Sequence, residues 1–400
     1  MTRHIDRNAH GRLSRRRFLK LAAAAGLLAG CSPAQKQVVT PTGVPTGTPV
    51  PTATPSPTTA SRSTSTPTPA VTPMPTVKVR RPEAIQFYPD APSKVVQTHH
   101  AGVWSGDELV PGALGQMLDA SITELTGLND ATEAWAALFA PDERIAIKVN
   151  AIGGHFGLVY THVPLAMVVA ERLQAIGVPA DQIFVFDRYT SELAKAGYPI
   201  NQDGPGVRCY GTSESGVFLR SSSNAADHYA AGWQIMDADV RLSDILSSCH
   251  AVINLPILTG GGQLGGEGAA GISFAIKNHF GTFNCPTDFH GERFGHGVVE
   301  LNALPPIRQR TRLIIGDILT ANTYQHFGRV VMGGRTILMS FDPVAHDTVG
   351  AQITARAFAE EGLDPMVITA RTAYWLGYGA ELGLGTNDPT RIDLQQVTLG

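Results

Sequence analysis

The segment that decides the fold runs from Arg144 to Asp187 and reads RIAIKVNAIGGHFGLVYTHVPLAMVVAERLQAIGVPADQIFVFD. Its ends, Arg144–Val149 and Ile183–Asp187, are short apolar runs rich in β-branched residues, as in strands buried on both faces of a sheet. Between them, Val163–Ile176 has helical spacing, with Thr161 as the expected N-cap and a stop at Gly177-Val178-Pro179. A strand, a helix and a second strand in this order predict a pair of parallel strands.

The same alternation continues on both sides of this segment. Apolar runs predict further strands, and helical spacing predicts further helices, the last with Asp342 as its N-cap and Pro343 as its first residue. The expected strands are Lys94–Thr98, Ala251–Leu255, Arg312–Asp317 and Thr336–Phe341, and the expected helices are Glu108–Thr126 and Val344–Glu360. We therefore predict an α/β fold with a mostly parallel sheet in a three-layer sandwich, in which the polar region 198–250 is an insertion or a cap.

Residues 1–31 have the pattern of an export signal. Ser14 to Lys20 (SRRRFLK) match the twin-arginine pattern, and the apolar run Leu21–Leu28 is too short to span a bilayer as a mature helix. Leu28-Ala29-Gly30-Cys31 then reads as a lipobox. These signals predict export through the twin-arginine machinery, lipidation of Cys31 and anchoring of the mature chain on a membrane surface, on the outer face of the cell membrane or in the periplasm.

Two further regions follow the signal. Residues 32–76 are rich in Pro, Thr and Ser, a composition that cannot bury enough apolar surface to fold, so we expect a disordered linker. Residues 77–400 should form a single α/β domain. This domain has 22 basic and 33 acidic residues, a net charge of −11, which argues against sequence-independent nucleic-acid binding.

Two of the five lysines in this domain interrupt apolar runs. Lys148 lies in IAIKVN and Lys277 in FAIKNH. A buried ammonium is costly unless it is paired, so each lysine needs an anionic partner, which is either an internal carboxylate or a bound ligand. An internal ion pair, or a lysine that reaches the surface, is the structural alternative.

Glycines and polar residues accompany both lysines. Asn150, Gly153 and Gly154 follow Lys148 at the carboxyl end of a strand, where open α/β sheets bind ligands. The glycine-rich run 260–271 precedes an apparent helix, Ile272–Phe280, that contains Lys277, Asn278 and His279. Glycines let backbone N–H groups approach an anion, although a mobile loop is the simpler reading.

Aspartates recur near strand ends, at Asp187, Asp317 and Asp342, and Asp347 follows in the last helix. Such a carboxylate can accept a proton, bind a metal or pair with a lysine. Asp342 alone is better explained as a helix cap.

Histidines near a Gly/Phe-rich loop suggest a second kind of site. A divalent metal would be held there by His279, His290, His296 and Asp288, although their spacing matches no compact metal motif. No C-x-x-C occurs, so we expect no iron–sulfur cluster.

Taken together, the chain resembles the bacterial and archaeal "domain of unknown function 362" family over roughly 90–400. The resemblance is carried by Lys148 and Asn150, and by AVINLP (251–256), AIKNHFGT (275–282), IIGD (314–317) and SFDPVAHD (340–347). Relatives tend to carry a Lys-x-His element after the Leu-Pro, where this chain has ILTGG (257–261), and some relatives carry ferredoxin-type cysteine clusters that are absent here. The resemblance implies the fold and the site more than a reaction.

Three functional hypotheses follow. The first is an exported enzyme or binding protein with a cleft for an anionic small molecule. Its catalytic residues would be Lys148, Lys277, Asp317 and Asp347, and its ligand-binding residues Asn150, Gly153, Gly154, Asp187, Asn278, His279 and Asp342. The second is the metal-dependent site, and the third is a non-catalytic module that binds a partner or polysaccharide in the cell envelope.

Overall fold

The computed structural model describes residues 91–152, 159–213, 229–260, 271–290, 293–322, 330–332 and 334–400. The predictions for the signal segment, Cys31 and the linker lie outside these residues, as do those for Gly153, Gly154 and most of the glycine-rich run.

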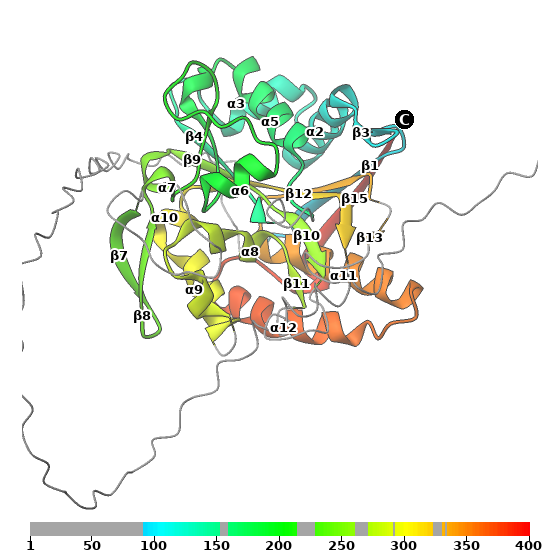
Figure 1. Ribbon diagram of the computed structural model, residues 1–400. Helices are drawn as coiled ribbons and strands as arrows, with labels where there is room; N and C mark the ends of the chain where they lie inside the picture. The colour runs from blue at the N-terminus through cyan, green and yellow to red at the C-terminus, as the bar shows by residue number, and fades with distance from the viewer. Residues whose placement is uncertain are drawn as a thin grey trace, which may run out of the picture. The chain divides into compact units, whose positions relative to one another are not determined.

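One large mixed sheet organises the domain (Figure 1). β14 is antiparallel to both of its neighbours, and every other neighbouring pair along the main path is parallel. The order is β15 (Ile392–Leu399), β1 (Ser93–His100), β14 (Thr336–Ser340), β12 (Thr311–Asn322), β9 (Ala251–Leu255), β4 (Ile145–Val149), β5 (Ile183–Phe186) and β6 (Arg208–Cys209). The predicted, mostly parallel sheet is confirmed.

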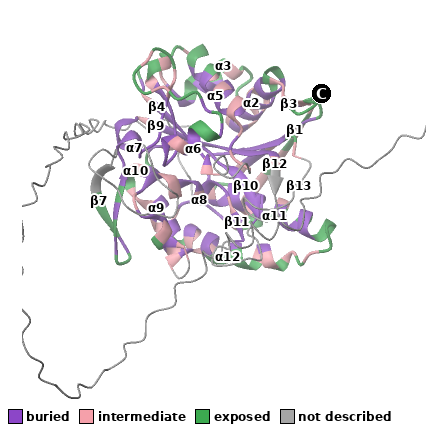
Figure 2. Cartoon of the chain, in the orientation of Figure 1, coloured by how far each residue is buried: buried purple, intermediate pink, exposed green. Residues whose placement is uncertain are grey.

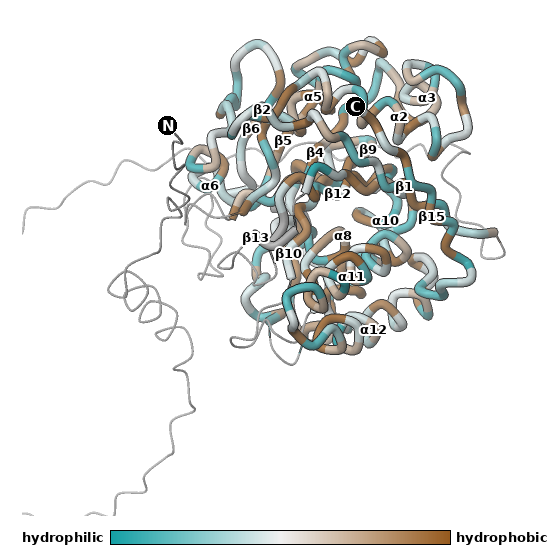
Figure 3. The backbone as a smooth tube through the Cα atoms, turned by 90° about the vertical axis from the view of Figure 1, so that its right-hand side faces the viewer, coloured by the Kyte–Doolittle hydropathy of each residue, from teal (hydrophilic) through white to brown (hydrophobic). Residues whose placement is uncertain are grey.

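Helices cover both faces of the sheet, with the strands between the two helical layers (Figures 1 and 3). One face packs against α2 (Pro111–Thr126), α3 (Ala131–Leu138) and α5 (Val163–Ala175). The other packs mainly against α8 (Ala275–Asn278), α9 (His296–Ala303), α11 (Pro343–Glu360) and α12 (Met366–Glu381). Burial is concentrated in the strands and in the helix faces against them, as Figure 2 shows. The predicted three-layer arrangement is confirmed.

Alternation of side chains along β4 shows on which face of the sheet Lys148 lies. Ile145, Ile147 and Val149 join the core under α2, α3 and α5, whereas Ala146 belongs to the core on the opposite face. Because side chains alternate along a strand, Lys148 lies on the same face as Ala146, beneath the layer that contains α8.

Smaller elements complete the described part of the domain. Two hairpins, β2–β3 and β7–β8, lie outside the large sheet, and the rest are short strands and single helical turns. Their bounds are β2 (Trp104–Ser105), β3 (Glu108–Leu109), β7 (Tyr229–Ile235), β8 (Ala238–Ser243), β10 (Ile257–Gly260), β11 (Ile272–Ser273), β13 (Val330–Met332), α6 (Thr190–Lys195), α7 (Asp244–Ser248), α10 (Pro305–Arg308) and the 3₁₀ turns Ala180–Gln182, His279–Thr282, Pro286–Phe289 and Pro389–Arg391.

Two predicted helix starts are wrong. The first helix begins at Pro111 because Glu108 and Leu109 form β3. The N-cap of α5 is His162, not Thr161. The hydroxyl of Thr161 instead donates to the carbonyl of Leu255 and accepts from the backbone N–H of Asn150, so it joins two strand ends.

The predicted helix Ile272–Phe280 is also wrong, because it is three pieces. Ile272 and Ser273 form β11, and α8 starts only at Ala275, after Phe274, whose backbone angles (φ −149°, ψ −131°) are not helical. A 3₁₀ turn, His279–Thr282, follows. The predicted N-cap at Asp342 is confirmed, since its carboxylate accepts from the N–H groups of Val344 and Ala345.

Candidate functional site

The direction of the chain reverses within the sheet between β4 and β9. From β4 the chain proceeds outward through β5 to β6, then returns to place β9 on the other side of β4 and β12 beyond it. Parallel strands at such a reversal leave a crevice at their carboxyl ends, which is where open α/β sheets bind ligands. Lys148 and Asn254 lie one position before the carboxyl ends of β4 and β9 and are directly opposite each other in the register of these strands.

An ion pair is buried at this edge. Lys148 Nζ lies 2.8 Å from Asp187 Oδ1, and the two side chains are 1% and 7% exposed. Lys148 also donates to the carbonyl oxygen of Val149 at 2.6 Å, and Asp187 Oδ2 accepts from the N–H of Ala151 at 2.7 Å. The predicted alternative of an internal partner for Lys148 is therefore confirmed, and the pair joins the ends of β4 and β5.

Burial controls the acid–base properties around this pair. It lowers the pKa of the Lys148 ammonium from its ordinary value, against the opposing charge of Asp187. The neighbouring Glu192 of α6 is also buried, and desolvation followed by repulsion from Asp187 raises its pKa to about 8. Glu192 is therefore mostly protonated at neutral pH, so that the Lys148–Asp187–Glu192 cluster holds two opposite charges and one neutral acid.

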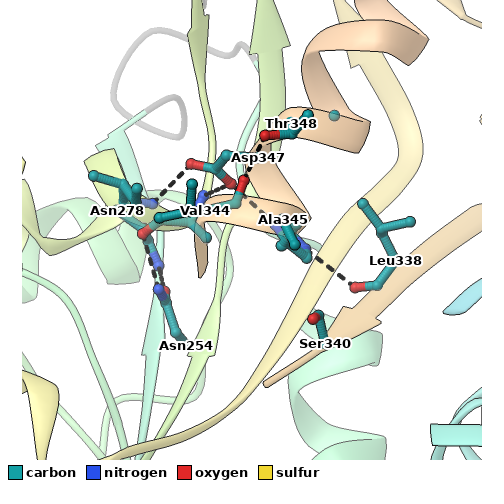
Figure 4. Close-up of polar contacts among 12 residues, drawn as sticks. Asn254, Asn278, Leu338, Ser340, Val344, Ala345, Asp347 and Thr348 are labelled. Carbon is teal, nitrogen blue, oxygen red and sulfur yellow. Dashed lines mark hydrogen bonds and ion pairs between the residues drawn. The ribbon is translucent and has the colours of Figure 1, made fainter. Parts of the chain in front are cut away.

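Two asparagines connect the sheet to the layer above it (Figure 4). The amide nitrogen of Asn278 donates to the carbonyl of Lys148 at 3.0 Å and to Asn254 Oδ1 at 2.7 Å. Asn254 in turn donates to the carbonyl of Ala275 at 2.8 Å. These bonds hold α8 across the β4–β9 junction, directly over the reversal point.

His279 is the least satisfied polar group of the site. Its ring is fully buried, and neither ring nitrogen has a hydrogen-bond partner among the described residues. Burial, and secondarily the charge of Lys148, lowers its pKa to about 3, so the imidazole is neutral. Such unpaired buried groups are rare in proteins and call for a physical explanation.

Gly281 fits against the ion pair. A Cβ atom at this position would lie 2.0 Å from Asp187 Oδ1 and 2.8 Å from Lys148 Nζ. Only glycine can occupy this position without displacing the carboxylate, so the turn 279–282 closes directly over the pair.

The second lysine has different surroundings. Lys277 is half-buried, and its Nζ lies over the rings of Phe280 and Phe294, 5.6 and 5.5 Å from their centroids. Lys277 belongs to the same short segment as Asn278 and His279, but the ammonium of Lys148 is held by Asp187 instead. That both lysines grip one ligand stays a prediction.

The remaining aspartates of the predicted site each accept backbone N–H groups. Asp347 accepts from the N–H groups of Ala275 and Ile276 at 2.9 and 3.0 Å, and so fixes the start of α8. Asp342 caps α11, and Asp317 accepts from His162 and Leu319. All three carboxylates are buried, and each holds two segments together.

Asn150 makes a local turn. Its side-chain oxygen accepts from the N–H of Ile152 at 3.3 Å, directly before Gly153 and Gly154, which lie outside the described residues.

The histidines of the predicted metal site have other contacts. His296 Nε2 lies 3.1 Å from the hydroxyl oxygen of Tyr374, and His290 Nδ1 lies 3.1 Å from the carbonyl oxygen of Pro286. Within the described ranges, no group of three or more His, Cys, Asp or Glu side chains is placed to hold a metal ion, so His279, His290, His296 and Asp288 receive no support as ligands.

The sequence interpretation missed Glu192, Asn254 and Gly281. Asn254 carried a usable signal, because it is a polar residue in an apolar strand, as Lys148 is. Glu192 carried none, because an acidic residue in the first turn of a helix is ordinary and only tertiary packing buries it.

Comparison with known proteins completes the description of the site. The family model described as "Domain of unknown function (DUF362)" matches residues 145–352, which contain every residue of the Lys148–Asp187 cluster and the turn above it. The chain belongs to the DUF362 family. No curated protein matches the chain. Within the described part of this DUF362 chain, no helix has the length and apolar character that crossing a bilayer requires.

Proposed function

We propose that this DUF362 chain is an exported lipoprotein whose α/β domain binds an anionic small molecule at the carboxyl edge of its sheet. His279 carries the proposal, because its neutral, buried imidazole has no partner on either nitrogen among the described residues and lies close enough to Lys148 to feel its charge. Leaving a buried donor or acceptor unpaired costs about 1–3 kcal/mol, a cost that a bound ligand removes.

The charges favour an anion over a cation. An anionic oxygen beside His279 accepts the imidazole N–H and interacts favourably with the Lys148 ammonium, whereas a cation would be repelled by that ammonium. Because Glu192 is mostly protonated, it does not oppose the anion and can itself donate a hydrogen bond. Asn278 and Gly281 fix the turn that presents His279.

Thermal unfolding with a panel of anions tests this proposal. The purified chain is heated with inorganic phosphate, glycerol phosphate, citrate or a simple carboxylate. We expect at least one to raise Tm in a saturable way, since a ligand at 100 times its Kd adds about 2.7 kcal/mol of stability. In the His279→Leu variant the anion effect should disappear, while the unliganded protein is as stable as the wild type or more so.

His296→Gln is the matched control, because His296 lies against Tyr374 and contacts no residue of the Lys148 cluster in the described structure. It should retain the anion effect. If no anion in the panel stabilises the wild type, or if His279→Leu responds as the wild type does, the anion site is wrong.

The proposed export and anchoring rest on residues 14–31 and are tested separately. Cys31→Ser should abolish incorporation of labelled fatty acid and move the protein from the membrane fraction to the soluble fraction. Replacing Arg15 and Arg16 together with Lys should retain the precursor inside the cell. A lipidated, exported product from either variant would contradict this part of the proposal.

A further inference from the structure

A second polar cluster lies at the start of α5, on β12. His162 Nδ1 is 2.7 Å from Asp317 Oδ2, and His162 Nε2 is 3.2 Å from the hydroxyl oxygen of Thr320. A carboxylate, an imidazole and a hydroxyl are thus connected in one line, which is the order of groups in enzymes that activate a hydroxyl nucleophile.

The hydrogen bonds determine which nitrogen of His162 carries the proton. Asp317 accepts from two backbone N–H groups, His162 through Oδ2 and Leu319 through Oδ1, so both of its oxygens act as acceptors. The neutral imidazole then donates through Nδ1, and its Nε2 has a lone pair that can accept the Thr320 hydroxyl proton. Burial opposes charge on the ring, but the Asp317 carboxylate outweighs it and raises the pKa of His162 above its ordinary value, which makes the ring a stronger base. This is the tautomer that a general base requires.

The exposure of the three side chains to solvent differs along the Asp317–His162–Thr320 line. Asp317 is completely buried, the His162 side chain is 17% exposed, and Thr320 is partly exposed. The ring of Trp104 meets His162 edge-on at 5.6 Å and is held by a bond from its Nε1 to the carbonyl of Leu319. The orienting acid is shielded from water, while the hydroxyl is within reach of a substrate.

This cluster is separate from the Lys148 site. Asp317 alternates in phase with Leu313, Ile315 and Leu319, which pack in the core under α2, α3 and α5, whereas Lys148 lies on the opposite face of the sheet. Nothing in the anion proposal uses His162 or Thr320, so either proposal can fail without the other.

We propose that Thr320 is a nucleophile for acyl transfer, with His162 as its general base, Asp317 as the positioning residue and a carboxylic ester with an uncharged acyl group as substrate. The apolar wall formed by Trp104 suits such a group. Thr320 Oγ1 bonds to the carbonyl carbon as its proton passes to His162 Nε2. The ester C–O bond then breaks, and the leaving alkoxide takes that proton. Water, deprotonated by the same imidazole, then attacks the acyl carbon. The bond from that carbon to Thr320 Oγ1 breaks, the imidazolium returns its proton to Oγ1, and the acid is released.

Covalent labelling tests the nucleophile directly. The full chain is treated with a fluorophosphonate probe, in which the attacking oxygen displaces fluoride from phosphorus, and the labelled residue is identified by peptide mass spectrometry. We expect Thr320 to be labelled. His162→Gln should slow labelling by about 10²–10⁴-fold, the usual contribution of a general base, and Thr320→Ser should restore what Thr320→Val abolishes.

The chain supplies its own control in a second Thr–His pair. His99 Nδ1 lies 3.4 Å from the hydroxyl of Thr336, and no carboxylate bond to His99 is found among the described residues. Thr336 should remain unlabelled, and His99→Gln should leave the labelling of Thr320 unchanged. Hydrolysis of p-nitrophenyl acetate should fall in parallel with labelling across the variants.

If His162 has only a structural role, the labelling results should be the opposite of those expected for a general base. If the pair only connects α5 to β12, His162→Gln lowers Tm while Thr320 is labelled no faster than Thr336 in the wild type. That result, or equal labelling in wild type and His162→Gln with both proteins folded by circular dichroism, would overturn the proposal.

Discussion

At the scale of single residues, the Lys148–Asp187 pair is a buried ion pair whose formation carries a large desolvation cost. Removing two ions from water is unfavourable, and their mutual attraction compensates only when the remaining bonding capacity is also satisfied. Here Lys148 donates to the carbonyl oxygen of Val149 and to Asn278 Oδ1, and Asp187 accepts from the N–H of Ala151. An ion pair with this many hydrogen bonds fixes the ends of β4 and β5 relative to each other.

Breaking one side of the pair should be worse than removing both. Lys148→Met leaves a buried, uncompensated carboxylate and should destabilise the protein by about 3–5 kcal/mol. The double variant Lys148→Met/Asp187→Asn should recover most of this loss, since the Asn oxygen can still accept from Ala151. Urea unfolding of the wild type, both single variants and the double variant measures the coupling, and additive losses would show that the ions do not interact.

Glu192 predicts a pH dependence of stability. Its folded-state pKa, about 8, exceeds the ordinary value of 4.5, so the folded form binds this proton more tightly than the unfolded form does. Its protonation therefore supports stability fully below pH 4.5, and that support is lost as the pH rises towards 8. Glu192→Gln should be neutral at acidic pH and stabilising near pH 9, as measured by chemical unfolding at both values. An equal effect at both would contradict the burial of this acid.

At the scale of elements, the segment from α8 through the turn 279–282 connects α11 to the carboxyl ends of β4 and β9. Asp347 of α11 fixes the start of α8, and Asn278 fixes its end on β4 and β9. Residues that are remote in the sequence thereby determine where a four-residue helix lies, which intrinsic propensity cannot do for so short a helix.

The close fit of this turn can be tested at Gly281. Gly281→Ala places a methyl group against Asp187 and Lys148, so it should destabilise the protein and weaken the proposed anion binding together. Gly112→Ala is the matched control, because a Cβ there meets nothing within 4 Å in α2. The control should be neutral or slightly stabilising. Equal Tm values for the two variants would show that the turn does not lie against the ion pair.

At the scale of the whole molecule, the family match and the folding unit differ in extent. The match spans 145–352, but β1 and β15 complete the sheet beyond β14, and α2 and α3 supply much of the core on one face. Ser93, before the match, and Thr386, after it, both donate to the Asp342 carboxylate.

A fragment limited to residues 145–352 should therefore fail to fold. It would leave β14 unpaired on one side and expose the core on the face that α2 covers, which includes Val169 of α5 and Ile337 of β14. Circular dichroism and limited proteolysis should show a disordered fragment, whereas residues 91–400 should unfold in one cooperative transition. A protease-resistant 145–352 fragment would show that the flanking elements are accessory.

The sequence by itself determined the layers of this protein. Periodicity and β-branched runs locate six of the eight strands on the main path of the sheet, because burial on both faces leaves a continuous apolar pattern. The edge strands β15 and β6 were not predicted. The position of Lys148 at a strand end and its need for an anionic partner also follow from local pattern alone. The prediction of a single helix over the apolar stretch 272–280 fails because Phe274 takes a non-helical conformation that no local sequence pattern indicates.

Only the tertiary structure decided which groups meet. It selected Asp187 as the partner of Lys148, placed Lys277 over two aromatic rings, assigned Asp342 and Asp347 to backbone donors, and brought His162 to Asp317 across 155 residues. The order of the strands, including the reversal between β4 and β9, determines which of these side chains come into contact. Pairing between distant strands is set by how a whole chain fills one core, and no short stretch of sequence contains that information.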